Sequence, residues 1–379
     1  MRKRLHSLSV DITQIHLYFI ENRKYMPLPL LFPYDALRNV QKELLETVQK
    51  CIEHKIPLVV HAPTGLGKTA ATIVPALTIA AEKDLTVFFL TSRQTQHLIA
   101  LETLKAIKTK FGVNKGTVSI VGKKHLCAQP GASLMRSEDF SSYCKSLRDE
   151  GKCSFYINAR NNNAPTIKAD ASAAQLMQAS PCASETVLQK GMDDELCPYE
   201  LSLMLAENAK VIIADYNHLF NPRIREALLS KIHRKLEQCI VIIDEGHNLP
   251  SRLREQLTQR ISTITLRRAI NEAKKHGYDD LHNNLQELSA LLQRLATGLY
   301  RDQEKLVTKE QFVTEITKIR KPDELAEALE DAADDIRSLE KTSSMGTIAT
   351  FLKGWTEGDA GFSRILSVKD IRTERTILL

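Results

Sequence analysis

Residues 58–69 read Leu-Val-Val-His-Ala-Pro-Thr-Gly-Leu-Gly-Lys-Thr, a short apolar run followed by a glycine-containing loop. The apolar run predicts a strand and the residues after Lys68 predict a helix, which is the context of a phosphate-binding loop. Gly65 and Gly67 let main-chain N–H groups approach phosphate oxygens at the helix N-terminus. We expect Lys68 to reach the β- and γ-phosphates and Thr69 to give Mg²⁺ a hydroxyl ligand. The stretch predicts an ATP site, and a plain Gly-rich turn is the alternative.

A second apolar run lies far along the chain and ends in acidic residues. Residues 240–243 read Ile-Val-Ile-Ile, and Asp244, Glu245, Gly246 and His247 follow. An unbroken run of this kind predicts a strand covered on both faces, and carboxylates at the end of such a strand face the ligand crevice. We expect Asp244 to hold Mg²⁺ through water and Glu245 to polarise the water that attacks the γ-phosphorus. Together with the upstream loop, the pair predicts ATP hydrolysis.

The composition is that of an intracellular chain with two or three domains. It has 379 residues, 43% of them hydrophobic, and a net charge of +6. No apolar run approaches the roughly 20 residues of a membrane helix, and the N-terminus lacks a signal peptide. Basic residues recur in 105–124, 223–235 and 252–260. Such groups suit a polyanion, and they equally suit ordinary solvated faces.

Five of the seven cysteines fall between the two nucleotide motifs. They are Cys127, Cys144, Cys153, Cys182 and Cys197, whereas Cys51 and Cys239 have the apolar surroundings of buried thiols. The spacings are too wide for a zinc ribbon built from two CxxC knuckles, and disulfides do not suit an intracellular chain. Four thiolates from a loop-rich insertion can hold an iron–sulfur cluster. Zinc, and a free thiol at Cys182, stay open.

The order of these motifs resembles the XPD family of iron–sulfur DNA helicases, relatives of the bacterial DinG type. Residues 62–69 are similar to the first motif of that family, in which alanine commonly replaces the first glycine. Residues 215–222, Asp-Tyr-Asn-His-Leu-Phe-Asn-Pro, resemble the segment before its DEAH-type motif. That motif reads Asp-Glu-Gly-His at 244–247. The resemblance implies catalytic roles for Lys68, Asp244, Glu245 and His247.

The same resemblance implies a 4Fe-4S cluster. Residues 122–127, Gly-Lys-Lys-His-Leu-Cys, look like the approach to the first cluster ligand, and residues 152–156 and 197–199 look like the third and fourth. The implied ligands are Cys127, Cys144, Cys153 and Cys197. Cys182 is the alternative to Cys153.

Two further matches are weaker. Residues 32–41 resemble the adenine-side motif, in which Arg38 and Gln41 would contact the base, although an ordinary amphipathic helix start has the same pattern.

Residues 91–96, Thr-Ser-Arg-Gln-Thr-Gln, follow the strand-like run at 87–90, where motors of this family contact the DNA backbone. Arg93, Thr95 and Gln96 are the residues implied, because amides, hydroxyls and arginine suit phosphate oxygens. A polar strand-to-helix cap is the alternative.

These patterns predict an α/β fold: a RecA-like P-loop sheet with a cysteine-rich insertion and a helical, arch-like insertion. Residues 1–121 begin helicase domain 1, 122–205 form the iron–sulfur insertion, and 206–250 return to domain 1. Residues 251–360 form the arch-like domain, with a leucine stripe at Leu281, Leu285, Leu288, Leu292 and Leu295. We expect 361–379 to return to domain 1, where the chain is truncated.

The implied function is that of an ATP-dependent DNA helicase moving 5′ to 3′ on single-stranded DNA in DNA repair. Its partners would be single-stranded DNA, duplex junctions and repair-complex proteins, in the cytoplasm of a prokaryote or the nucleus of a eukaryote. No QxxGR-like arginine motif occurs, so a second RecA-like domain is required and this chain alone is expected to be poorly active. The alternatives are a P-loop ATPase with a zinc-bound insertion that acts on RNA or protein, and a non-catalytic nucleic-acid-binding fragment.

Overall fold

The computed structural model describes residues 8–11, 31–34, 37, 39–63, 65–135, 137–340, 342–356, 361–371 and 374–379. The chain divides into two compact units. The sheet unit comprises Met1–Pro130 and Cys153–Glu255, and the helical unit comprises Gly131–Lys152 and Gln256–Leu379. Arg38 and Thr64 lie outside the described residues.

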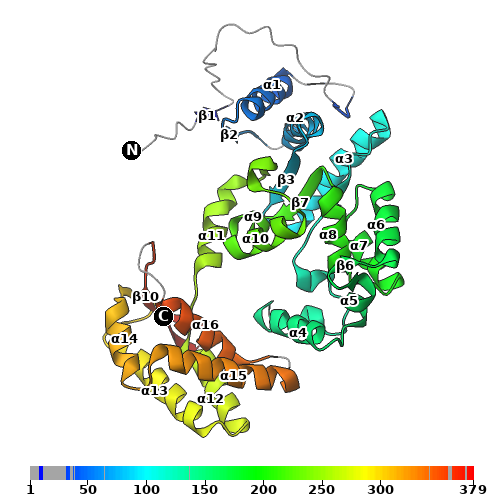
Figure 1. The fold of residues 1–379 in the computed structure, drawn as a ribbon. Helices are drawn as coiled ribbons and strands as arrows, with labels where there is room; N and C mark the ends of the chain where they lie inside the picture. Colours follow the sequence, from blue (N-terminus) through cyan, green and yellow to red (C-terminus); the bar gives the residue numbers. More distant parts are fainter. Residues whose placement is uncertain are drawn as a thin grey trace. The chain divides into compact units, whose positions relative to one another are not determined.

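A four-stranded parallel sheet organises the sheet unit (Figure 1). Its strands, in spatial order, are β4 (Thr117–Ser119), β7 (Val211–Asp215), β3 (Thr86–Thr91) and β8 (Cys239–Ile243). In the register Leu90 pairs with both Ala214 and Ile243. The residues that follow β3, β7 and β8 therefore meet at one edge of the sheet.

Helices cover both faces of this sheet. On one face the strands share a core with α1 (Asn39–Glu53), α2 (Lys68–Glu82) and α3 (His97–Phe111). On the other face the core includes α6 (Ile167–Ala179), α7 (Ser184–Asp193), α8 (Pro198–Asn208) and α10 (Pro222–Lys231). The shorter elements of the unit are β1 (Leu8–Asp11), β2 (Leu58–His61), α5 (Ser154–Ala159), β5 (Arg160–Asn161), β6 (Ala164–Pro165), α9 (Asn217–Phe220) and α11 (Leu249–Leu257).

The β8 strand is less covered than its sequence predicts. Val241 and Ile243 keep 39% and 37% of their surface exposed, whereas every residue of β3 is buried. β8 is the last strand of the four-stranded sheet, and β2 pairs in parallel with β1 in a separate two-stranded sheet. The expectation that residues 240–243 are covered on both faces was wrong, because an apolar run does not reveal whether its strand lies at an edge.

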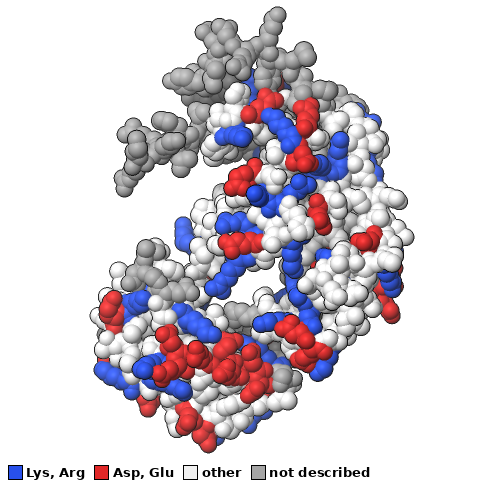
Figure 2. Space-filling view, viewed as in Figure 1, with Lys and Arg blue, Asp and Glu red and all other residues white. Residues whose placement is uncertain are grey.

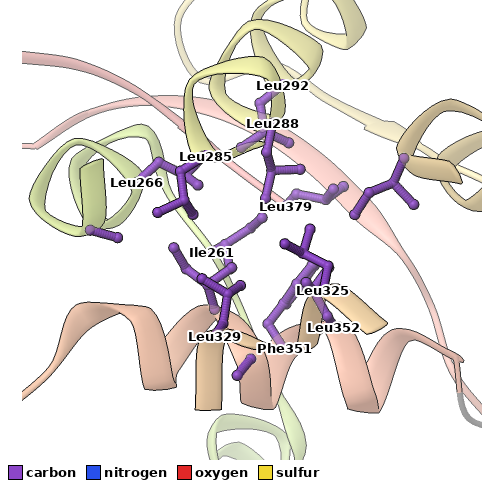
Figure 3. Close-up of a cluster of buried hydrophobic side chains, with 14 of the residues drawn as sticks. Ile261, Leu266, Leu285, Leu288, Leu292, Leu325, Leu329, Phe351, Leu352 and Leu379 are labelled. Atoms are coloured by element: carbon purple, nitrogen blue, oxygen red, sulfur yellow. The ribbon is translucent and has the colours of Figure 1, made fainter. Parts of the chain in front are cut away.

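The helical unit contains six helices among its described residues. They are α4 (Ser137–Asp149), α12 (Thr263–Lys275), α13 (Asp279–Leu295), α14 (Lys309–Thr317), α15 (Pro322–Glu340) and α16 (Ser344–Thr356). Figure 3 shows leucines of α12, α13, α15 and α16 meeting in one apolar core. The predicted stripe is confirmed on α13, because Leu281, Leu285, Leu288 and Leu292 are buried and Leu295 packs against the core.

Three antiparallel strands complete the helical unit. They are β9 (Glu304–Leu306), β10 (Ile365–Ile371) and β11 (Glu374–Leu378), with β10 in the middle. Main-chain bonds in both directions also join Leu379 to Ile261. We expected residues 361–379 to return to the parallel sheet, but their hydrogen bonds lie within the helical unit. The segment 131–152, expected in the cysteine-rich insertion, belongs to this unit as well.

Charge is unevenly distributed over the helical unit. Figure 2 shows acidic side chains gathered over α15, the helix whose opposite face buries Leu325, Leu329 and Ile336. This is the arrangement of an amphipathic helix with a solvated acidic face. Among the described residues, no helix combines the length and the apolar character needed to cross a membrane.

Candidate nucleotide site

The phosphate-binding loop has the predicted strand-loop-helix form. β2 ends at His61 and α2 begins at Lys68. Gly65 and Gly67 have φ angles of +82° and +84°, a left-handed conformation that glycine adopts without steric cost. The Lys68 ammonium donates a hydrogen bond to the main-chain oxygen of Ala62 at 3.0 Å. The Lys68 side chain thus lies across the loop that precedes it.

Helix α1 packs against this loop through Gln41. The Gln41 side chain is buried, and a Cβ atom placed on Gly67 would fall well inside contact distance of its Nε2 atom. Gln41, predicted to contact the adenine, therefore lies beside the phosphate-binding loop. The backbone angle favours glycine at position 67, and a larger residue there would require the end of the Gln41 side chain to move.

The Asp244 carboxylate after β8 lies within electrostatic reach of the loop lysine. Asp244 continues the strand pairing, because its N–H donates to the Leu90 oxygen at 2.8 Å. Burial raises the pKa of Asp244, the neighbouring Glu245 raises it further, and the Lys68 charge opposes both effects. Because the Lys68 charge acts on Asp244, the acidic end of β8 and the phosphate-binding loop lie on the same side of the sheet unit. Thr69 is half-buried at the start of α2, a helix that contacts β8.

Glu245 has an unusual backbone. Its φ angle is +50°, in the left-handed region that non-glycine residues rarely occupy. Its carboxylate lies 3.3 Å from Nδ1 of His247, whose side chain is largely exposed. Backbone strain of this kind persists only where surrounding contacts hold it, and it is frequent at active sites.

Tyr216, which the sequence analysis did not single out as a site residue, supplies such contacts. Its hydroxyl donates to the main-chain oxygens of Asp244 at 2.5 Å and Glu245 at 3.0 Å. The side chain is 2% exposed. One signal was available in the sequence, because Tyr216 directly follows a strand that ends at the same edge as β8.

The loop after β3 is held by its own glutamine. Gln96 Oε1 accepts hydrogen bonds from the Ser92 N–H and hydroxyl and from the Arg93 N–H, at 3.1 to 3.2 Å. Arg93 and Thr95 are exposed, and Gln96 is half-buried. The loop therefore has the capped form that was the alternative reading, and it leaves Arg93 and Thr95 open to solvent.

Three of the predicted cluster cysteines lie at the ends of neighbouring elements in the sheet unit. Cys127 follows the turn Lys123–Leu126, which contacts α8, and Cys197 directly precedes α8. The Cys197 N–H donates to the Phe155 oxygen at 2.8 Å, two residues beyond Cys153. Cys144 belongs to α4 of the helical unit.

No group of three or more His, Cys, Asp or Glu side chains that could hold a metal occurs within the described ranges. Burial raises the pKa of Cys197 to about 12.

The remaining cysteines have local roles. Cys182 is buried in the core beneath α8, where its thiol donates to the Leu176 oxygen at 3.0 Å. This contact favours a structural thiol at Cys182 and therefore Cys153 as the third predicted ligand. Cys51 and Cys239 are partly buried rather than fully buried as expected, and the Cys239 thiol donates to the Lys235 oxygen.

Comparison with known proteins agrees with the sheet and its motifs. The DEAD_2 family model matches residues 89–266. The chain is 27% identical over 309 residues to the ATP-dependent DNA helicase XPD of Sulfolobus acidocaldarius, covering 81% of this chain and 47% of the relative. It is 22% identical over 274 residues to the regulator of telomere elongation helicase 1 homolog of Caenorhabditis briggsae, covering 64% of this chain and 26% of the relative. The chain thus spans between about a quarter and a half of these relatives.

Solved structures show the same fold. A structure titled XPD_Helicase matches 91% of this chain and 54% of its own, with a TM-score of 0.58 and 22% identity. Another, titled Truncated XPD, matches 82% of this chain and 81% of its own, with a TM-score of 0.53 and 22% identity.

The parallel sheet, the phosphate-binding loop and the acidic end of β8 together define a RecA-like P-loop domain. The DEAD_2 match over residues 89–266 and these relatives show that the chain is similar to helicases of the XPD type.

Proposed function

We propose that this chain is the ATP-binding half of a DNA helicase, in which ATP hydrolysis drives 5′ to 3′ movement along single-stranded DNA. The observation that carries the proposal is the Asp244–Glu245 pair at the end of β8, on which the Lys68 charge acts. A relative named as an ATP-dependent DNA helicase supports the choice of polymer. The second RecA-like domain, with its transition-state arginine, would come from elsewhere in the protein.

The site residues have different roles in ATP hydrolysis. N–H groups of the loop around Gly65 and Gly67 bind the phosphates, and Lys68 exchanges its bond to Ala62 for the β- and γ-phosphate oxygens. Glu245 orients a water for in-line attack on the γ-phosphorus and accepts its proton as the bond to the bridging oxygen breaks. Thr69, and Asp244 through water, would hold Mg²⁺, which would neutralise phosphate charge. Gln41 and Arg38 would hold the base, and His247 would orient Glu245.

DNA would bind along the loop that follows β3. Arg93 and Thr95 are exposed there and would contact backbone phosphates, with Gln96 shaping the loop from within. Duplex junctions and repair-complex proteins are the further partners we propose. A DNA helicase must be where the DNA is, so we propose that the protein is located in the cytoplasm of a prokaryote or the nucleus of a eukaryote.

ATP hydrolysis measured with no polymer, single-stranded DNA, or RNA tests the proposal, using the protein together with its second RecA-like domain. We expect turnover that depends on Mg²⁺ and rises with single-stranded DNA. Turnover that rises only with RNA, or with neither polymer, would favour the alternative of a P-loop ATPase with a zinc-bound insertion that acts on RNA or protein. Absence of ATP turnover under all three conditions would support the alternative of a non-catalytic nucleic-acid-binding fragment.

We further propose that Cys127, Cys144, Cys153 and Cys197 hold a 4Fe-4S cluster. The neighbouring elements that carry three of them, and the core position of Cys182, support this set. Protein purified without oxygen should show a broad absorption band near roughly 400 nm, with iron and sulfide near four each per chain. Cys197→Ser should lose the band while the matched variant Cys182→Ser keeps it. Colourless protein with one zinc per chain would instead support the zinc-bound insertion.

A further inference from the structure

The hydroxyl of Tyr216 lies where the ends of three strands meet. Its main-chain N–H donates to the Thr91 oxygen at the end of β3, and its hydroxyl reaches the main-chain oxygens of Asp244 and Glu245 after β8. The residue itself directly follows β7. A single buried side chain thus connects the β3 loop to the acidic strand end.

The direction of these hydrogen bonds is fixed by chemistry. Carbonyl oxygens only accept, so the phenol must donate its proton to Asp244 and Glu245. The phenol is therefore the donor in both contacts with the acidic strand end.

Ser92 continues the connection into the β3 loop. Its hydroxyl donates to Gln96 Oε1 at 3.1 Å, and its side chain is close enough to the Tyr216 phenol to affect the pKa of that group. A hydroxyl has only one proton, so the Ser92 proton that is donated to Gln96 is not donated to the phenol oxygen. A ligand that moves Gln96 away would free this proton for the phenol.

We propose that Tyr216 is a positioning residue that holds the strained Glu245 backbone for ATP hydrolysis and couples it to the loop Ser92–Gln96. This inference rests on the proposed function, because it assigns that loop to the polymer and Glu245 to the attacking water. Tyr216 touches neither substrate; it acts through the main chain of Asp244 and Glu245. DNA bound at the loop would thereby alter the position of the catalytic carboxylate.

Tyr216→Phe tests the inference, because it removes the hydroxyl and keeps the buried ring. We expect the kcat of ATP hydrolysis with single-stranded DNA to fall about 10- to 100-fold, the usual cost of a small misplacement of a catalytic group. The Kd of a fluorescent ATP analogue should stay within about twofold, since the phosphate-binding loop is untouched. Tyr278→Phe is the matched control, because its phenol bonds Asp335 in the helical unit. The control should change neither quantity.

Ser92→Ala tests the loop side of the connection. The ratio of turnover with DNA to turnover without it should fall about fivefold, the value of one hydrogen bond. A wild-type ratio, or a Tyr216→Phe enzyme with wild-type kcat, would overturn the inference. So would equal losses of ATP affinity and turnover in Tyr216→Phe, which would indicate a merely structural role.

Amide hydrogen exchange separates failure of this inference from failure of the proposed function. In Tyr216→Phe the peptide covering 244–248 should exchange faster than in wild type, whether or not DNA stimulates turnover. If wild-type turnover ignores DNA but exchange rises, the proposed function fails while the positioning role stands. Unchanged exchange in this peptide would refute the positioning role itself.

Discussion

The ammonium of Lys68 donates to the main-chain oxygen of Ala62 at 3.0 Å, across the loop that joins β2 to α2. Ala62 occupies the place of the first glycine in the general phosphate-loop pattern, and it is buried. The bond uses only a main-chain atom, so alanine serves as well as glycine at that position. Phosphate binding must replace this bond with a stronger, charge-assisted one.

Lys68→Met should therefore reduce ATP turnover far more than it reduces folding stability. Loss of one charge-stabilising group typically lowers kcat by about 10²- to 10³-fold. Steady-state ATP hydrolysis measures the effect. Lys83→Met, at the exposed far end of the same helix, is the control and should match wild type. Equal turnover in the two variants would contradict the role of Lys68.

Gly67→Ala and Gly65→Ala form a matched pair. Both residues have φ near +80°, so each alanine adds about 1–2 kcal/mol of backbone strain. Only at Gly67 would the new Cβ collide with Gln41, while at Gly65 no atom lies within 4 Å. Overpacking of this kind should weaken binding of an ATP analogue roughly tenfold more in Gly67→Ala. Fluorescence titration checks this, and equal affinities would mean that Gln41 moves aside freely.

Glu245→Gln should separate nucleotide binding from hydrolysis. The amide keeps the size of the side chain but cannot accept the proton of the attacking water, so kcat should fall about 10²- to 10⁴-fold. Affinity for ATP should remain, because Lys68 and the loop amides are unchanged. Glu255→Gln, on the exposed surface of α11, is the control. A variant that still turns over near the wild-type rate would assign the base elsewhere.

The local elements of the site could be read from the sequence, and their spatial order could not. A strand, two loop glycines and Lys68 at a helix start are properties of neighbouring residues, and the structure has all of them. The exposure of Val241 depends on β8 being the last strand of its sheet, which no local pattern encodes. Tyr216 is a similar case. Its contact with Asp244 follows from the register of β3, β7 and β8. These strands are separated by long stretches of chain.

His97 should make the sheet unit sensitive to acid. It is 3% exposed, and burial lowers its pKa to about 4, although Asp215 and Glu185 favour its charge and His218 opposes it. The unfolded chain binds the proton near pH 6.5, so stability is complete above that pH and declines as the pH falls toward 4. Between pH 7.5 and 5 this one group should remove about 2 kcal/mol.

Denaturant unfolding of wild type and His97→Gln at both pH values checks the prediction. The variant should be less stable at pH 7.5, because the contact of His97 Nδ1 with the Ser119 hydroxyl at 2.8 Å is altered. Its further loss on acidification should be smaller than that of wild type. Parallel losses in the two proteins would show that His97 does not contribute to the acid sensitivity.

Substitution of Arg337 should lower the unfolding free energy of the helical unit strongly. Its guanidinium, 8% exposed, bonds Glu330 at 3.0 Å and Asp334 at 2.7 Å, and lies 3.5 Å from the buried Asp139 carboxylate of α4. Removal of one partner from a buried ionic group typically costs about 3–5 kcal/mol. Arg337→Met should lose that much unfolding free energy and also loosen α4 from α15.

Lys353→Met is the matched control, since this exposed lysine lies 3.9 Å from the same Glu330. An exposed pair is worth about 1 kcal/mol or less, so the control should lose little. Amide exchange of residues 137–149 should rise only in Arg337→Met, because Arg337, unlike Lys353, lies against the Asp139 carboxylate on α4. Similar losses in both variants, with α4 still protected, would mean that apolar packing rather than the ionic contact holds this segment in the helical unit.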